Sequence, residues 1–334
     1  MPAVVDTAEA AIARPSLSAT RYLLQLEDVI DSTDNPDALD WVQDFGGGHP
    51  VGEVVATPPL SVDVAYDKHI VKVTFDEITW SIGGGMSSSM REWLSYILQG
   101  GAINDFFPPM TRVTGAGFGL DVRNRPVRYL AFSQALVSQI TLPAMDARQK
   151  GEAEIRVKMV PESTERAVQP PFPALPAELP AANKKQSRWL KSNFRFGFVG
   201  DTQEMNTACE RIVSIDAFTI RQVLVEADLG DVRIPQLTPT SLEVPNLVLT
   251  IPEIHAEPFY AWLDEFVVKG SSTSEKTADL EYLSPNLKST LMNVRFDGLG
   301  IVSIKPESVE TGARASSLVR VEMYCERVSL YLPG

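Results

Sequence analysis

Apolar side chains recur at helical spacing in two places along this chain of 334 residues. In the first half they are Met90, Trp93, Leu94, Ile97 and Leu98, and in the second half Phe259, Trp262, Leu263, Phe266 and Val267. Within each set the residues fall at i, i+3, i+4, i+7 and i+8, which is one face of an α-helix. Every residue of the first set lies 169 positions before its counterpart. The pattern predicts two amphipathic helices, each with one face in a hydrophobic core.

Alternating apolar and polar residues predict strands around each helix. Residues 70–75 and 247–251, rich in β-branched side chains, precede the two helices. Three stretches follow each helix, and the first and last of them recur 164 positions later in the chain. They are residues 127–132, 137–143 and 155–159, and residues 291–296, 300–306 and 319–323. Residues 21–26 and 193–198 predict a further strand at the front of each half.

Four blocks in the same order, at a nearly constant offset, indicate a tandem duplication. Each unit follows the order β-β-β-α-β-β-β. A single helix of about three turns is not stable alone in water, so a sheet must cover its apolar face. We therefore expect a mainly β fold of two tandem β-sandwich or barrel domains, each with one packed α-helix.

A proline-rich stretch separates the two halves. Residues 161–185 contain six prolines, which fix φ and remove backbone donors, so an extended linker is expected there. The predicted organisation is an N-terminal arm at residues 1–17, a first domain at 18–162, a linker at 163–185 and a second domain at 186–334. The start of the chain carries Asp6 and Glu9 in place of a basic patch, so we expect no secretory signal.

Charge and cysteine content exclude several classes of protein. The formal net charge is −13, which argues against an outer surface that grips nucleic acid, and no specific nucleic-acid binding is expected. The two cysteines, Cys209 and Cys325, form neither a zinc motif nor a disulfide framework. No run of eighteen apolar residues occurs, so membrane insertion is not expected.

Motifs that carry chemistry are scarce. His49, His69 and His255 are far apart in the sequence, so no metal site is expected. The glycine clusters at residues 83–85 and 115–119 match neither a P-loop nor a dinucleotide-binding motif. The sequence therefore predicts no cofactor and no catalytic residue, and a protein that is not an enzyme.

The order of these elements resembles the tail-tube protein family of contractile-tailed bacteriophages. The same fold builds inner tubes of type VI secretion and of extracellular injection systems. The matching stretches of the second half are residues 246–251, 257–262, 295–306 and 318–331, and those of the first half are 71–75, 90–94 and 128–159. By this resemblance the chain would carry two such domains, whereas an ordinary tube subunit carries one.

The resemblance implies self-association into a ring around a central channel. Three chains would give a trimer with pseudo-sixfold symmetry, whereas six would form a hexamer with two stacked or concentric layers. It also implies tube, baseplate or sheath partners, synthesis in the bacterial cytoplasm, and a place in a virion tail or injection particle. Residues at two hairpins would reach neighbouring subunits. The candidates are Asp44, Gly47, Val51, Val55, Gln222, Val225, Asp228 and Pro235.

Two other functions are compatible with the residues. A β-barrel module could bind a small apolar ligand in its interior, and saturable binding of a hydrophobic dye would distinguish it. An enzyme of unrecognised chemistry would need a pocket with convergent polar groups. The leading hypothesis is a structural component of a contractile phage tail or injection system, in a tube or a tube–baseplate hub.

Overall fold

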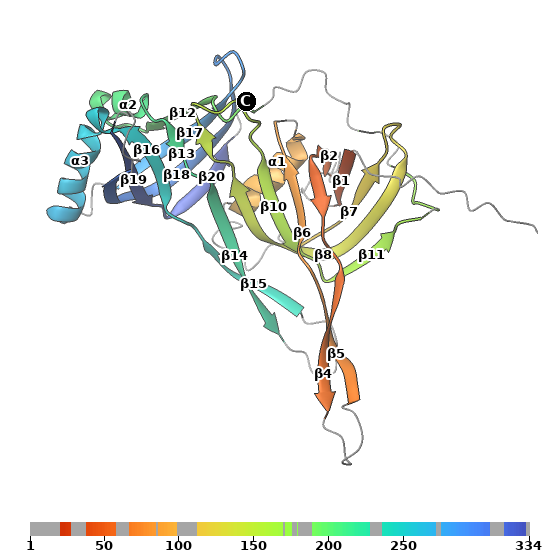
Figure 1. Cartoon of the computed structure of the whole chain (residues 1–334). Coiled ribbons are helices and arrows are strands. Elements are labelled where there is room, and N and C mark those ends of the chain that lie inside the picture. Colours follow the sequence, from red (N-terminus) through yellow and green to blue (C-terminus); the bar gives the residue numbers. More distant parts are fainter. Residues whose placement is uncertain are drawn as a thin grey trace, which may run out of the picture.

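A computed structural model describes most of the chain as two β lobes that lie side by side (Figure 1). The described residues are 21–27, 38–57, 67–84, 86–98, 112–169, 171–175, 179, 189–227, 236–271, 275–307 and 317–331. The predicted N-terminal arm at residues 1–17 lies outside them. We call residues 21–167 the first lobe and residues 189–331 the second lobe.

The first lobe contains one helix among eleven strands in its described residues. In chain order they are β1 (Arg21–Glu27), β2 (Ala38–Val42), β3 (Asp44–Gly46), β4 (Pro50–Thr57), β5 (Asp67–Phe75), β6 (Ile78–Ile82), α1 (Ser88–Leu98), β7 (Arg112–Leu120), β8 (Pro126–Leu142), β9 (Met145–Asp146), β10 (Ile155–Val160) and β11 (Ser163–Ala167).

The second lobe is built from similar elements. They are β12 (Phe194–Phe198), α2 (Gln203–Cys209), β13 (Ser214–Ile215), β14 (Phe218–Ala227), β15 (Gln236–Glu243), β16 (Leu247–Pro252), a 3-10 turn η2 (Glu253–His255), α3 (Glu257–Leu263), a π-helical turn η3 (Asp264–Val268), β17 (Lys276–Leu283), β18 (Thr290–Pro306), β19 (Leu318–Tyr324) and β20 (Arg327–Tyr331). Strands dominate both lobes, so the prediction of a mainly β chain is confirmed.

One long strand organises each lobe. β8 pairs with β7 on one edge and with β10 and β11 on the other, and all of these pairings are antiparallel. β18 pairs in the same way with β17, β19 and β20. The order β1-β7-β8-β10-β6-β3 of the first lobe thus parallels the order β12-β17-β18-β19-β16-β13 of the second. Both sheets curve into barrel-like shapes (Figure 1).

The face predicted for the first helix is buried in its entirety. Met90, Trp93, Leu94, Ile97 and Leu98 all lie in the core, where Trp93 stacks on Trp80 of β6 at 6.2 Å between ring centroids. Trp80, Trp93 and Phe132 are among the largest fully buried side chains of the first lobe.

The second helix departs from the predicted face at its end. Phe259 and Trp262 are buried, and Leu263 and Phe266 are partly buried, but Val267 is 51% exposed. The hydrogen-bonding pattern changes at Asp264 from α-helical to π-helical, and the wider turn rotates the following residues away from the α-helical face. Placing Val267 on the core face was therefore wrong.

Three further sequence expectations need correction. The strand directly before α1 is β6, because residues 70–75 belong to β5 of a hairpin that precedes it. The second lobe has an additional short helix, α2, which Thr202 caps by accepting from the Met205 N–H. The first five residues assigned to the linker form β11, which pairs with β8 and is part of the first lobe's sheet.

Leu175 and Leu179, further along the predicted linker, pack on a small apolar cluster outside the main core of the first lobe. That cluster contains Leu23, Phe118 and Leu120 from β1 and β7. The linker is thus anchored on the sheet at these two leucines, because leucine side chains gain free energy when they leave water.

Candidate assembly surfaces

The two lobes are joined by main-chain pairing between strands. The first four residues of β14, which belongs to the second lobe, pair with the last four of β8 in the first lobe, from Phe218↔Leu142 to Arg221↔Gln139. β14 occupies the edge of β8 that β7 leaves after Leu136. A strand that adds to another sheet's edge gains backbone hydrogen bonds as well as side-chain contacts.

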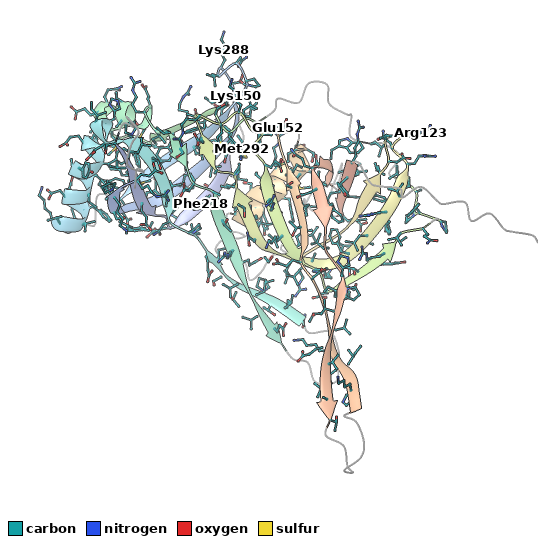
Figure 2. All side chains as sticks on the ribbon, in the orientation of Figure 1. Arg123, Lys150, Glu152, Phe218, Lys288 and Met292 are labelled. Carbon is teal, nitrogen blue, oxygen red and sulfur yellow. The ribbon has the colours of Figure 1, made fainter. Side chains whose placement is uncertain are left out.

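A second strand pairing lies next to the first. The two-residue strand β13 is paired on one side with β16 of its own lobe and on the other with β9 of the first lobe. The neighbouring segment adds backbone hydrogen bonds, such as Ala153 N–H to the Trp189 carbonyl at 2.9 Å. Figure 2 labels Phe218 and Glu152 at this boundary between the lobes. Each lobe's sheet thus includes a strand from the other lobe, β14 in the first and β9 in the second.

Side chains at the junction are apolar and well buried. Ile140 of β8 faces Ile220 of β14, and both are almost inaccessible to water. Beside them the Thr141 and Thr219 hydroxyls lie 3.1 Å apart. Phe218 packs edge-on against Phe296 of β18 at 5.2 Å. The junction residues belong to one hydrophobic core that runs through both lobes.

Helix α1 also touches the second lobe. The Ser95 hydroxyl donates to the Leu330 carbonyl of β20 at 2.9 Å. Near the same boundary, Arg148 donates to the Asp146 carboxylate at 3.0 Å and lowers its pKa. Backbone, core and helix contacts therefore fix the two lobes to each other.

The first predicted hairpin projects below the first lobe as the β4–β5 ribbon (Figure 1). Val51 and Val55 lie on β4, where every residue is exposed. Asp44 lies on β3 and pairs with Ser81, and Gly47 follows with φ of +94°. A side chain at Gly47 would meet the Glu77 carbonyl, so this turn requires glycine.

The second predicted hairpin is the β14–β15 ribbon, which runs from the second lobe toward the first (Figure 1). Gln222 and Val225 lie on β14, whereas Asp228 and Pro235 lie outside the described residues. Glu226 pairs with Lys72 of β5, and Arg112 donates to the Leu237 carbonyl of β15. This hairpin therefore contacts the first lobe of its own chain.

Few side chains that could bind a metal ion or act in catalysis stand out among the residues that the structure describes. No group of three or more His, Cys, Asp or Glu there could hold a metal ion. Cys209 and Cys325 are buried, and burial raises the pKa of each thiol to about 12. His49 is exposed and hydrogen-bonded to Asp76. Residues 115–119 lie inside β7, where Gly117 leaves room for the Phe45 ring.

Over the same described ranges, no helix has the length and apolar character needed to cross a membrane.

No protein-family model and no curated protein matches this chain. Solved structures with similar folds include the tube-terminating cap of the anti-feeding prophage, at 12% identity and a TM-score of 0.36. That match covers 48% of this chain and 96% of the cap chain. The PVC sheath/tube terminator of an extracellular contractile injection system matches at 12% identity over 47% of this chain and 99% of its own, with a TM-score of 0.34. Hcp1 from Flavobacterium johnsoniae matches at 10% identity over 42% and 95%, with a TM-score of 0.26.

The residues that join the lobes were not predicted from the sequence. Ile140, Leu142, Phe218 and Ile220 alternate with polar residues, which predicts a strand and one buried face but not the partner. The sequence predicted two separate strands at residues 127–132 and 137–143, and only the folded sheet joins them into the 17-residue β8, of which its own lobe pairs part of each edge.

Proposed function

We propose that this protein is a structural component of a contractile phage tail or injection system, forming part of a tube or tube–baseplate hub ring. The observation that carries this proposal is the junction in which β14 extends the sheet of the first lobe. A β domain that adds its strand to the next domain's sheet is a repeating unit for a closed assembly.

A repeated unit within the chain would support this function. We infer that the chain is a tandem duplication, because β8 and β18 are each 17 residues long and have corresponding partners. If both lobes use the same contact, three chains supply six domains around one axis. Six chains would instead build two stacked or concentric layers. We propose the trimer, because the rigid junction already joins two domains into one unit.

The proposed role is mechanical and needs no chemistry. The exposed β4–β5 ribbon would contact an adjacent ring, baseplate protein or sheath protein in the assembled particle. An isolated two-stranded ribbon is marginally stable in water, and a neighbouring surface would stabilise it.

Mass photometry of the purified protein over a range of concentrations, with negative-stain imaging, tests this function. We expect particles with three times the mass of one chain and a central hole. A particle of six chains would support the layered arrangement. A monomer at every concentration, both alone and mixed with tube and baseplate proteins, would refute the proposed function.

A further inference from the structure

The long strand of the second lobe has an open edge. β17 pairs with β18 as far as Leu299, and β19 pairs with the opposite edge from Gly300 to Pro306. Within the described part of the chain, no strand pairs with the β17 side of β18 beyond Leu299. The corresponding edge of β8 is the one that carries β14.

The correspondence between the two strands can be fixed residue by residue. Ile140 pairs with Val157 of β10, and Ile304 pairs with Val321 of β19. Each ladder has a register shift at the same place, just before Gln139 in β8 and just before Ser303 in β18. Residues 303–306 of β18 therefore correspond to residues 139–142 of β8.

Exposure differs between these matched segments. Ile140 and Leu142 are 2% and 1% exposed beneath β14. On β18, Ile304, the counterpart of Ile140, is only partly buried, and Pro306, the counterpart of Leu142, is exposed. The open edge thus leaves apolar side chains in water where its counterpart has them covered.

The first lobe carries the matching segment, and in the described residues strands pair with only one of its edges, β6 with β3 and β5 with β4. In the first lobe Asp44 of β3 pairs with Ser81 of β6, and in the second lobe Ser214 of β13 pairs with Thr250 of β16. Asp44 therefore corresponds to Ser214, an offset of 170 residues. Pro50 then corresponds to Ile220, and His49 to Thr219. Ile220 is buried against β8, whereas His49 and Pro50 are exposed.

We propose that residues 48–51 of a second copy, where β3 leads into β4, pair antiparallel with the open edge of β18 at residues 303–306. This inference rests on the proposed function and names the contact that would join one chain to the next. A second copy is the occupant because the same chain already makes this contact once, between its own lobes. The contact is head-to-tail, so repetition can close a ring.

The expected ladder is weaker than the internal one. The Glu307 N–H donates to the Leu318 carbonyl at 2.8 Å, so by alternation the N–H and carbonyl of Ile304 face the open edge. Pro50 would lie opposite Ile304, and proline has no N–H to donate. Pro306 likewise offers only its carbonyl. Copies should therefore separate on dilution while the two lobes of each chain stay joined.

Exposed apolar residues near the open edge support the same contact. Phe266 of η3 packs on Tyr324 at 6.1 Å, and Tyr324 is paired with Gly300, where the open segment begins. Val267 and Val268, next to Phe266, are 51% and 73% exposed. On α1 the counterpart of Val267 is Leu98, which is buried on a helix that contacts the second lobe.

Disulfide trapping between two single variants tests the contact. His49→Cys and Lys305→Cys change exposed residues that correspond to Thr219 and Thr141, whose hydroxyls lie 3.1 Å apart. The two variants, one with a size tag, are mixed and oxidised gently. The double variant Thr141→Cys/Thr219→Cys is the matched control and should form a disulfide within one chain. Cys209 and Cys325 should form no disulfide under these conditions, because both thiols are buried and have raised pKa values.

The proposal expects a mixed disulfide dimer that is several-fold more abundant than either homodimer. Rings seen by mass photometry without this mixed dimer would overturn the contact and leave the proposed function standing. A product made only of His49→Cys homodimers would overturn the head-to-tail geometry. A wild-type chain that stays monomeric alone and with tube and baseplate proteins, with no mixed dimer, would overturn the contact and the proposed function together.

Discussion

Asp40 is a carboxyl group held in the core of the first lobe, where it is 2% exposed. Its two oxygens accept from the Ser87 backbone N–H at 2.7 Å and from the Ser87 hydroxyl at 2.6 Å, at the start of α1. Burial raises its pKa to about 6, although these hydrogen bonds act in the opposite direction. The residue connects β2 to the beginning of the helix.

Replacement of Asp40 by asparagine should change how stability depends on pH. The raised pKa means that the folded state binds the proton more tightly, so wild-type stability rises as pH falls from 7 toward 4.5. We expect the free energy of unfolding of the wild type to gain about 2 kcal/mol over this range relative to Asp40→Asn. Urea titrations at several pH values measure this gain, with Glu53→Gln on the exposed β4 as control. Parallel profiles for wild type and Asp40→Asn would contradict the assignment.

Gly117 should tolerate no side chain. A Cβ there would lie 2.2 Å from the Phe45 ring, so the ring must move. We expect Gly117→Ala to lower the free energy of unfolding by about 1–3 kcal/mol, as overpacking does. Gly46→Ala is the matched control, because no atom lies within 4 Å of its Cβ position. Equal effects in chemical denaturation would show that the Phe45 contact does not matter.

At the scale of elements, α1 and the α3–η3 helix have the same apolar spacing but different outcomes. α1 is helical through Leu98, so both of its last two apolar residues reach the core. The second helix becomes π-helical at Asp264 and ends before Gly270, which has φ of +71°. The local apolar spacing thus predicts a helix in both places, but it does not predict which way the last turn of the helix faces.

The matched pair Leu98→Ala and Val267→Ala measures this difference. We expect Leu98→Ala to cost about 2–4 kcal/mol, because it leaves a cavity in the core. Val267→Ala should stay within about 0.5 kcal/mol in the dissociated chain, because its side chain is half exposed. Denaturant titrations at a concentration where the chain is monomeric give both values. Similar losses for the two variants would indicate a buried Val267.

At the scale of the whole molecule, the two lobes form one mechanical unit. Their hydrophobic core is continuous, and β14 and β13 of the second lobe pair with strands of the first. Lobes that share a core and hydrogen-bonded strands are expected to unfold together. This coupling differs from the common case of two domains on a flexible linker.

Calorimetry should therefore record one unfolding transition for the chain. We expect Ile220→Asp, which places an unpaired charge against Ile140, to lower that single transition temperature for both lobes. Lys305→Ala on the open edge of β18 is the control and should leave the transition of the monomer in place. Two separate transitions, of which only one responds to Ile220→Asp, would show that the lobes are independent.

Features that depend on local periodicity can be read from the amino-acid sequence alone. The apolar faces of α1 and α3, the alternation along β8 and β18, and the mainly β fold follow from spacings of a few residues. The same patterns also predict a repeated order of blocks. Residues 163–167 were misassigned, because the prolines that surround them indicate an extended linker and say nothing of a paired edge strand.

Which strand edges meet is fixed only when the chain has folded. Backbone N–H and carbonyl groups are alike in almost every residue, so the sequence does not name the partner of β14. The pairing of β14 with β8 depends on the edge that β7 leaves free, which exists only after the first lobe has folded. Partner choice for β13, the direction of Val267 and the docking of Leu175 and Leu179 were settled in the same way. Each depends on contacts between segments far apart in the chain, where local periodicity carries no information.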